Sequence, residues 1–104
     1  MIVVNSETIS GKEITETIGL VRGSTVRARN IGRDIFASLK NLVGGEISEY
    51  TQLLADSREQ ALQRMITDAK NKGADAVINL RFTTSTVMQG CSEILAYGTG
   101  VKLK

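Results

Sequence analysis

Two runs of alternating apolar and polar residues end the chain, and they constrain its fold more than any other feature. They cover residues 76–88 and 91–103, and only Gln89 and Gly90 separate them. Alternation over this length predicts β-strands that each carry one apolar face. A two-residue connection joins antiparallel neighbours, so the runs predict a long β-hairpin.

The turn determines how the residues of this hairpin pair. With a two-residue turn, the apolar faces of both strands fall on the same side of the sheet, as a buried face requires. Glutamine is not a preferred first residue of such a turn, so a wider or bulged turn is the alternative. The expected pairs are Met88 with Cys91, Phe82 with Tyr97, and Ile78 with Val101.

Residues 46–72 show the periodicity of one long amphipathic helix. At about 100° per residue, four apolar residues share a narrow arc, namely Ile47, Leu54, Ala61 and Met65. A break at Ser57 is the alternative, because Ser57 with Gln60 resembles a capping box. The arc keeps its phase across that point, which favours one helix. Gly73 suits the position just after the helix, where glycine adopts a left-handed backbone conformation.

The first third of the chain predicts strands as well. Residues 14–28 are rich in Thr, Val and Ile and alternate in polarity. They indicate a long strand that bulges or bends near Gly19 or Gly23. Residues 2–4 form a short apolar run, typical of an edge or terminal strand.

A shorter helix is predicted between the first long strand and the long helix. Asn30 is a favourable N-cap for a helix that begins at Ile31 and ends at the Gly44-Gly45 pair. The elements fit a single domain over residues 1–104. We therefore expect a two-layer α+β fold, in which a short and a long helix cover one face of an antiparallel sheet.

Composition narrows the class of function. The chain has no histidine, which removes the most frequent general base and metal ligand, and we expect no enzymatic activity. Its one cysteine excludes an internal disulfide and suits the reducing cytoplasm. The net charge of +2 is too small to indicate nucleic-acid binding. No apolar run reaches the roughly 18 residues of a membrane span, so we expect no membrane association.

Arg58 is the polar residue that fits its position least well. It lies near the centre of the apolar arc of the long helix. Its guanidinium must therefore reach solvent, pair with a carboxylate or cross a subunit interface. Asp34 and Asp75 are the candidate partners, and we favour a structural ion pair over a ligand site.

Cys91 and Glu93 form the candidate metal pair. They lie two residues apart on one face of the last predicted strand, where a thiolate and a carboxylate suit a soft or transition metal. Met88, across the turn, would add a thioether. One chain supplies too few ligands for a closed tetrahedral site, so copies around a symmetry axis would have to complete it. The alternative is that Glu93 projects past the helices near the hairpin tip.

Ala96, Gly98 and Gly100 alternate along the last strand and leave one of its faces bare. Small residues in a strand mark a place where another backbone approaches closely. We expect a neighbouring subunit, or the short N-terminal strand, to lie over this face.

Several segments with fixed spacing complete the pattern. They are Asn30-Ile31-Gly32-Arg33-Asp34, Phe36, Gly44-Gly45, Tyr50, Arg58, Gly73-Ala74-Asp75-Ala76-Val77 and Tyr97-Gly98-Thr99. Together they resemble the YbjQ family, a group of small uncharacterised bacterial and archaeal proteins labelled heavy-metal-binding. The resemblance extends from about residue 14 to residue 101, which is nearly the whole chain.

The resemblance implies an α+β subunit that assembles into a ring, a homopentamer, with no established activity. It thus implies a small structural or ligand-binding module, with heavy-metal binding through Cys91 and Glu93 across subunits as the alternative. No other cofactor is implied. The heavy-metal label fits this chain poorly, because one cysteine and no histidine offer few soft ligands. The family pattern often has alanine where this chain has Gly100.

Six polar residues within the matching segments make up a candidate binding or structural cluster. They are Asn30, Arg33, Asp34, Tyr50, Arg58 and Asp75. Our hypothesis is that Arg58 pairs with Asp34 and ties the short helix to the long one. Asp75 would then bond to backbone groups at the junction between the long helix and the strand that follows.

Overall fold

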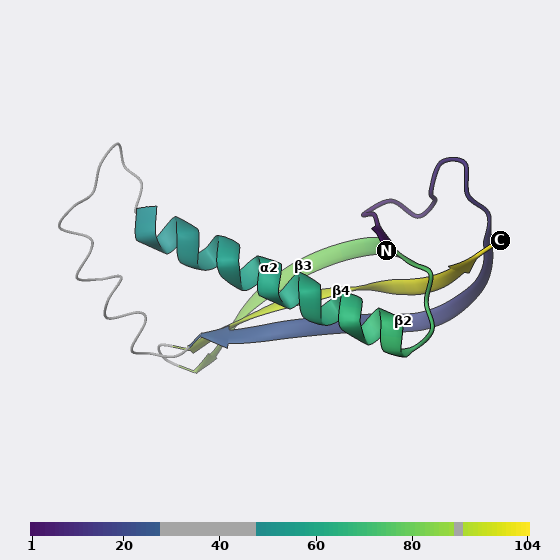
Figure 1. Ribbon diagram of the computed structural model, residues 1–104. Coiled ribbons are helices and arrows are strands. Elements are labelled where there is room, and N and C mark those ends of the chain that lie inside the picture. The colour runs from purple at the N-terminus through teal and green to yellow at the C-terminus, as the bar shows by residue number, and fades with distance from the viewer. Residues whose placement is uncertain (28–47, 89–90) are drawn as a thin grey trace.

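A four-stranded sheet with one long helix across it forms the described part of the chain (Figure 1). The computed structural model describes residues 1–27, 48–88 and 91–104. The elements are β1 (Ile2–Val3), β2 (Ile14–Arg27), α2 (Ser48–Asn71), β3 (Ala76–Met88) and β4 (Cys91–Leu103). The strand order across the sheet is β1-β3-β4-β2, so β1 and β2 lie at opposite sides. The α+β architecture is confirmed.

The sheet is mixed, so the prediction of a purely antiparallel sheet is wrong at one strand. β4 pairs antiparallel with both β2 and β3, but β1 runs parallel to β3. No tight turn joins β1 to a neighbour, because ten residues separate it from β2. Its direction therefore could not be inferred from alternation. The short helix predicted after Asn30 lies outside the described residues.

The β3–β4 hairpin follows the predicted register only next to its turn. The observed pairs are Met88 with Cys91, Phe82 with Ala96, and Ile78 with Thr99. The predicted pairing of Phe82 with Tyr97 and of Ile78 with Val101 is wrong, because the register shifts twice, first between Thr86 and Met88 and again between Ile78 and Arg81. Each shift places an extra residue in β3, as a β-bulge does. In the second, Asn79 has a φ of 54°.

The bare face predicted for β4 is the face that α2 covers. The buried residues on it are Ile94, Ala96, Gly98 and Gly100. A Cβ on Gly98 would lie 2.7 Å from Cγ1 of Val77. On the neighbouring strand β2, a Cβ on Gly23 would lie 2.6 Å from the carbonyl oxygen of Ala61 in α2. The expectation of a neighbouring subunit or β1 over this face is therefore wrong, because the protein's own helix and side chains fill the space.

α2 is one continuous helix of 24 residues, as predicted. Its end is a Schellman motif, in which Gly73 has a φ of 83°. The amide of Ala74 donates to the carbonyl of Ala69, and the amide of Gly73 donates to the carbonyl of Lys70, both at 3.0 Å. These two bonds satisfy carbonyl groups that the last turn would otherwise leave without partners.

The face of α2 that packs on the sheet is centred elsewhere than predicted. The buried residues of the helix are Ser57, Ala61, Met65 and Ala69, at a spacing of four. Arg58 is exposed, so its placement at the centre of the buried stripe is wrong. The reason is size: the helix lies closest to the sheet where its side chains are small, whereas the predicted arc followed hydrophobicity alone.

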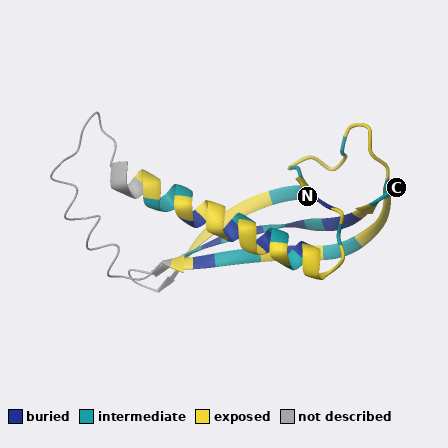
Figure 2. Cartoon of the chain, viewed as in Figure 1, coloured by how far each residue is buried: buried dark blue, intermediate teal, exposed yellow. Residues whose placement is uncertain are grey.

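The opposite face of the sheet is covered only at one end. There, Ala76, Ile78 and Val101 form a second, small cluster. The N-terminal segment supplies Val4 and Ile9 to it. The rest of this face carries no further layer from the described residues, and Figure 2 shows the long exposed stretches of the strands.

Candidate functional site

The predicted polar cluster is only partly visible in the described chain. Three of its six residues lie outside the described ranges: Asn30, Arg33 and Asp34. Tyr50 lies within the first turn of α2. Arg58 and Asp75 are separated by more than three turns of that helix, about 20 Å, so the structure does not bring them together. The Arg58–Asp34 pair stays a prediction.

Asp75 acts at the backbone, as the hypothesis held. Its Oδ2 accepts a hydrogen bond from the amide of Leu103 at 2.9 Å. Its own amide donates to the carbonyl of Val101 at 2.8 Å. Asp75 therefore ties the end of β4 to the start of β3, and this position is structural.

Side chains of α2 bond directly to the outer edge of β2. Arg64 Nη1 donates to the carbonyl of Ser24 at 2.6 Å, the amide of Arg22 donates to Asp68 Oδ2 at 3.0 Å, and Lys72 Nζ donates to the carbonyl of Leu20 at 3.1 Å. The spacings match, because four helical residues advance about 6 Å and two strand residues about 6.8 Å. We call this the capped edge. Sequence reasoning missed it, although the basic and acidic residues at four-residue spacing were a visible signal.

Asp68 is the centre of the capped edge. The amide of Arg22 and, after it, the side chain of Lys72 donate hydrogen bonds to Asp68 and lower the pKa of its carboxyl group. Lys72 Nζ lies 3.0 Å from Asp68 Oδ2, and the pair is partly exposed. Because both donors favour the charged carboxylate, the contact depends on pH.

The capped edge predicts a pH-dependent loss of stability. Asp68→Asn is expected to lower the free energy of unfolding by about 1 kcal/mol near neutral pH. The pKa of Asp68 is depressed in the folded state, so its contribution is present above the unfolded value of about 3.9. It disappears as the pH falls through the folded value. Urea unfolding of both proteins between pH 2 and pH 7 measures this difference.

A control separates this effect from the general loss of a negative charge. Glu59→Gln removes a carboxylate from the exposed side of the same helix and should change the free energy of unfolding by less than about 0.5 kcal/mol. A difference for Asp68→Asn that stays constant down to pH 2 would contradict the role of the ionised carboxylate.

The other long edge of the sheet, on β3, is open. β1 pairs only with Ala76 and Val77. The segment after β1 extends the bonding as far as Leu80, whose amide donates to the carbonyl of Val4 at 3.0 Å. Residues 81–86 are all exposed. Among the described residues, none bonds to the outer edge of β3 over residues 82–86, which we call the open edge.

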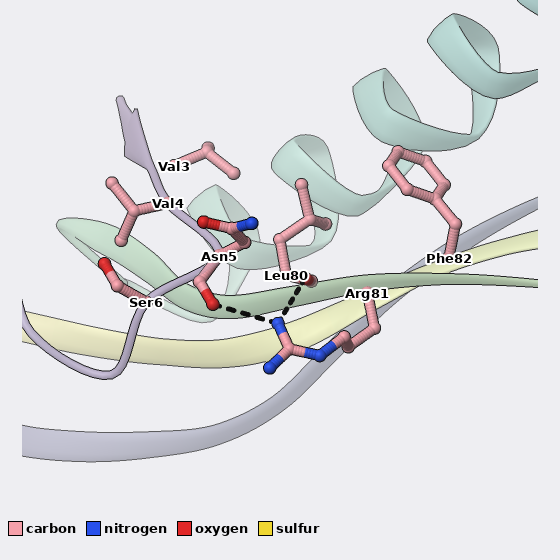
Figure 3. A pocket seen from close by; sticks show the side chains of 7 residues that line it. All are labelled: Val3, Val4, Asn5, Ser6, Leu80, Arg81 and Phe82. Carbon is pink, nitrogen blue, oxygen red and sulfur yellow. Dashed lines mark hydrogen bonds between the residues drawn. The ribbon is translucent and has the colours of Figure 1, made fainter.

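A shallow hollow lies where the open edge begins (Figure 3). Its lining consists of Val3, Val4, Asn5, Ser6, Leu80, Arg81 and Phe82. Arg81 Nη1 donates to the carbonyls of Asn5 and Leu80, at 2.9 and 2.8 Å. The guanidinium thus fixes the N-terminal segment against β3. Phe82 is 43% exposed beside it, so an apolar surface adjoins the open edge.

The face of the sheet turned away from α2 carries exposed apolar side chains. Leu20 is 58% exposed and Val26 is 56% exposed, both on β2. Leu95 and Tyr97 on the neighbouring β4 are half-buried. We call this set the uncovered face.

The residues predicted to bind metal lie near the hairpin end of the sheet. The register sets Cys91 opposite Met88, and Glu93 lies two residues further along β4, where it is half-buried. Within the described residues, no group of three or more His, Cys, Asp or Glu side chains gathers to hold a metal ion. One subunit therefore supplies no complete site in the part of the chain that the structure covers.

These features define the protein as a small α+β subunit with one exposed sheet face and one open strand edge. Nothing in the described residues indicates catalysis, and no helix among them is long and apolar enough to cross a membrane. The chain belongs to the YbjQ family, because the family model described as "Putative heavy-metal-binding" matches residues 1–104. This is a family of uncharacterised proteins.

Relatives from archaea and bacteria share most of the sequence. A UPF0145 protein of Methanosarcina acetivorans is 54% identical over 103 residues, which cover 99% of this chain and 97% of that protein. A UPF0145 protein of Halorubrum lacusprofundi is 60% identical over 100 residues, which cover 96% of each chain. A UPF0145 protein of Photobacterium profundum is 57% identical over 103 residues, covering 99% of this chain and 100% of the relative.

A solved structure shares the fold. It is a protein of unknown function from Pediococcus pentosaceus, described as a member of the DUF74 family, with a TM-score of 0.65. The match covers 100% of this chain and 98% of the other at 17% sequence identity. At that identity, the likeness concerns the fold alone.

Proposed function

We propose that this protein is a non-catalytic building block that assembles with identical copies into a closed ring, a homopentamer. It would act in the cytoplasm as a structural or ligand-binding module. The observation that supports the proposal best is the uncovered face. Leu20 and Val26 are each more than half exposed there, and contiguous apolar surface on a soluble protein usually marks an interface.

The shape of the subunit also favours assembly. β2, β3 and β4 are 13 or 14 residues long, more than twice the usual strand length of 5–6 residues. One helix cannot cover both faces of so long a sheet. A ring forms when the uncovered face of one subunit packs on a different surface of the next, since such a contact repeats until it closes.

Native mass spectrometry tests the ring. We expect assemblies built from five copies of the 11.2 kDa chain, about 56 kDa per ring. Leu20→Lys combined with Val26→Lys puts charges on the uncovered face and should leave no species of five or more copies. Thr8→Lys, on the exposed N-terminal segment, is the matched control and should keep the ring. A monomeric wild-type protein, or an unchanged ring in the double variant, would refute the proposal.

Heavy-metal binding is the second candidate, carried by Cys91 and Glu93 of several subunits. It is favoured by the register, which sets Cys91 opposite Met88 and two residues from Glu93. Ring symmetry would bring several copies of these ligands together, as a soft-metal site needs. The same mass spectra report bound metal: a metal present in the wild type and absent from Cys91→Ala supports this candidate. Equal and negligible metal in both removes it.

A further inference from the structure

The two long edges of the sheet differ in their protection. Along β2, side chains of α2 bond to the edge at Leu20, Arg22 and Ser24. A strand that paired there would have to displace the helix. Along β3, bonding ends at Leu80, and the described residues leave the edge from Phe82 to Thr86 unoccupied.

The backbone of the open edge is oriented for pairing with another strand. The amide of Leu80 points away from β4, because it donates to the carbonyl of Val4. In an antiparallel strand, the N–H and C=O groups of every second residue point to the same side. Those of Phe82, Thr84 and Thr86 therefore point outward as well. No described residue bonds to them.

The side chains of the open edge carry none of the usual safeguards. Residues 82–88 read Phe-Thr-Thr-Ser-Thr-Val-Met, without a charge, a proline or a glycine. Soluble proteins guard exposed edges with lysine, proline, a bulge or a covering element, because an unguarded edge recruits other strands. This chain guards β2 with three charged side chains of α2 and leaves β3 unguarded. The contrast indicates that another strand covers the open edge.

We propose that the open edges of two copies pair antiparallel about a twofold axis and form one continuous sheet. In a twofold contact, each residue faces its own segment in the other copy. Like charges opposite one another would oppose such pairing, whereas Thr–Thr and Thr–Ser pairs favour it. The uncharged, hydroxyl-rich sequence of residues 82–86 is complementary to itself. A register centred on Ser85 sets Thr84 of each copy opposite Thr86 of the other and uses the outward groups of both.

The capped edge limits this association to two copies. After pairing through β3, the outer edges of the joined sheet are the two β2 strands. Both are occupied by α2, so no third sheet can add. The capped edge thus turns an interaction that would otherwise propagate into fibres into a closed one. The contact is separate from the uncovered face, and together the two contacts join two rings into ten copies.

Thr84→Lys tests the pairing. Thr84 is exposed, so the substitution leaves the subunit fold intact, but in the pair it sets two charges close together. We expect a twofold fall in mass by native mass spectrometry, from ten copies of 11.2 kDa (about 112 kDa) to five (about 56 kDa). If the ring does not form, the fall is from two copies to one. Thr8→Lys is the control with unchanged mass. Circular dichroism confirms folding, and Thr86→Lys replaces Thr84→Lys if that chain does not fold.

Mixing oppositely charged variants distinguishes a twofold contact from a ring contact. Thr84→Lys and Thr84→Asp chains, each of half mass alone, should regain the full mass when mixed, because each charge then meets its opposite. A wild type and a Thr84→Lys variant of equal mass would overturn the proposal, whether that mass is one copy or five. A fall from five copies to one, without rescue on mixing, would also overturn it and assign the open edge to the ring.

Discussion

Gly23→Ala is expected to destabilise the subunit by about 3 kcal/mol or more. The added Cβ would meet the amide nitrogen of Met65 and lie 2.6 Å from the carbonyl oxygen of Ala61. Both atoms belong to the backbone of α2, which cannot rotate out of the way as a side chain can. The helix would have to lift from β2 along the middle of the core. Since a domain of this size has roughly 5–15 kcal/mol of stability in total, much of the chain would unfold.

Gly100→Ala is the matched control for Gly23→Ala. Its Cβ would lie 3.1 Å from Cβ of Ala74 and from Cγ1 of Val21, which are side-chain atoms that can shift by a few tenths of an ångström. We expect a cost below about 1.5 kcal/mol. Urea unfolding followed by circular dichroism compares the two variants. Equal stabilities would show that α2 does not rest on Gly23 as the structure has it.

The main elements could be predicted because their patterns depend on nearby residues alone. Alternation located β2, β3 and β4, and the apolar arc located α2. Gly73 marked the end of that helix correctly, because glycine at this position is needed for the left-handed backbone of the Schellman motif.

The pairing of the strands could not be predicted so well, because it depends on bulges that the sequence does not mark. Asn79 adopts a φ of 54° inside β3, at a position where a regular strand was expected. One extra residue in a strand exchanges the two faces of everything beyond it. For this reason, Ala96 rather than Tyr97 lies opposite Phe82. The small residues of β4 consequently lie under α2 and not on a free face.

The candidate site was predicted least well, because it consists of edges rather than of reactive side chains. Asp75 was located correctly, since a carboxylate at a helix–strand junction has few possible roles. Arg58 was not, because the buried side of α2 depends on how closely small residues let it approach the sheet. The capped and open edges depend on which strands are outermost, and strand order is a property of the whole fold.

Met65→Ala is expected to lower the free energy of unfolding by about 3 kcal/mol, within the range of 2–5 kcal/mol for such truncations. Met65 has the largest fully buried side chain in the described part of the chain. It packs in the core with Val21, Ala96 and the other buried residues between α2 and the sheet. Its neighbours there are small or belong to a rigid strand, so they cannot close over the space that truncation leaves.

Met65→Leu separates the loss of volume from the loss of the thioether. The two side chains have similar volumes, so we expect this variant to lose less than about 1.5 kcal/mol. Urea unfolding of all three proteins at one protein concentration is the measurement, because assembly adds stability that varies with concentration. A cost below 1 kcal/mol for Met65→Ala would mean that α2 is held to the sheet mainly by the capped edge. In that case Asp68→Asn would have to cost more than about 1 kcal/mol, so the two variants together determine what binds the helix to its sheet.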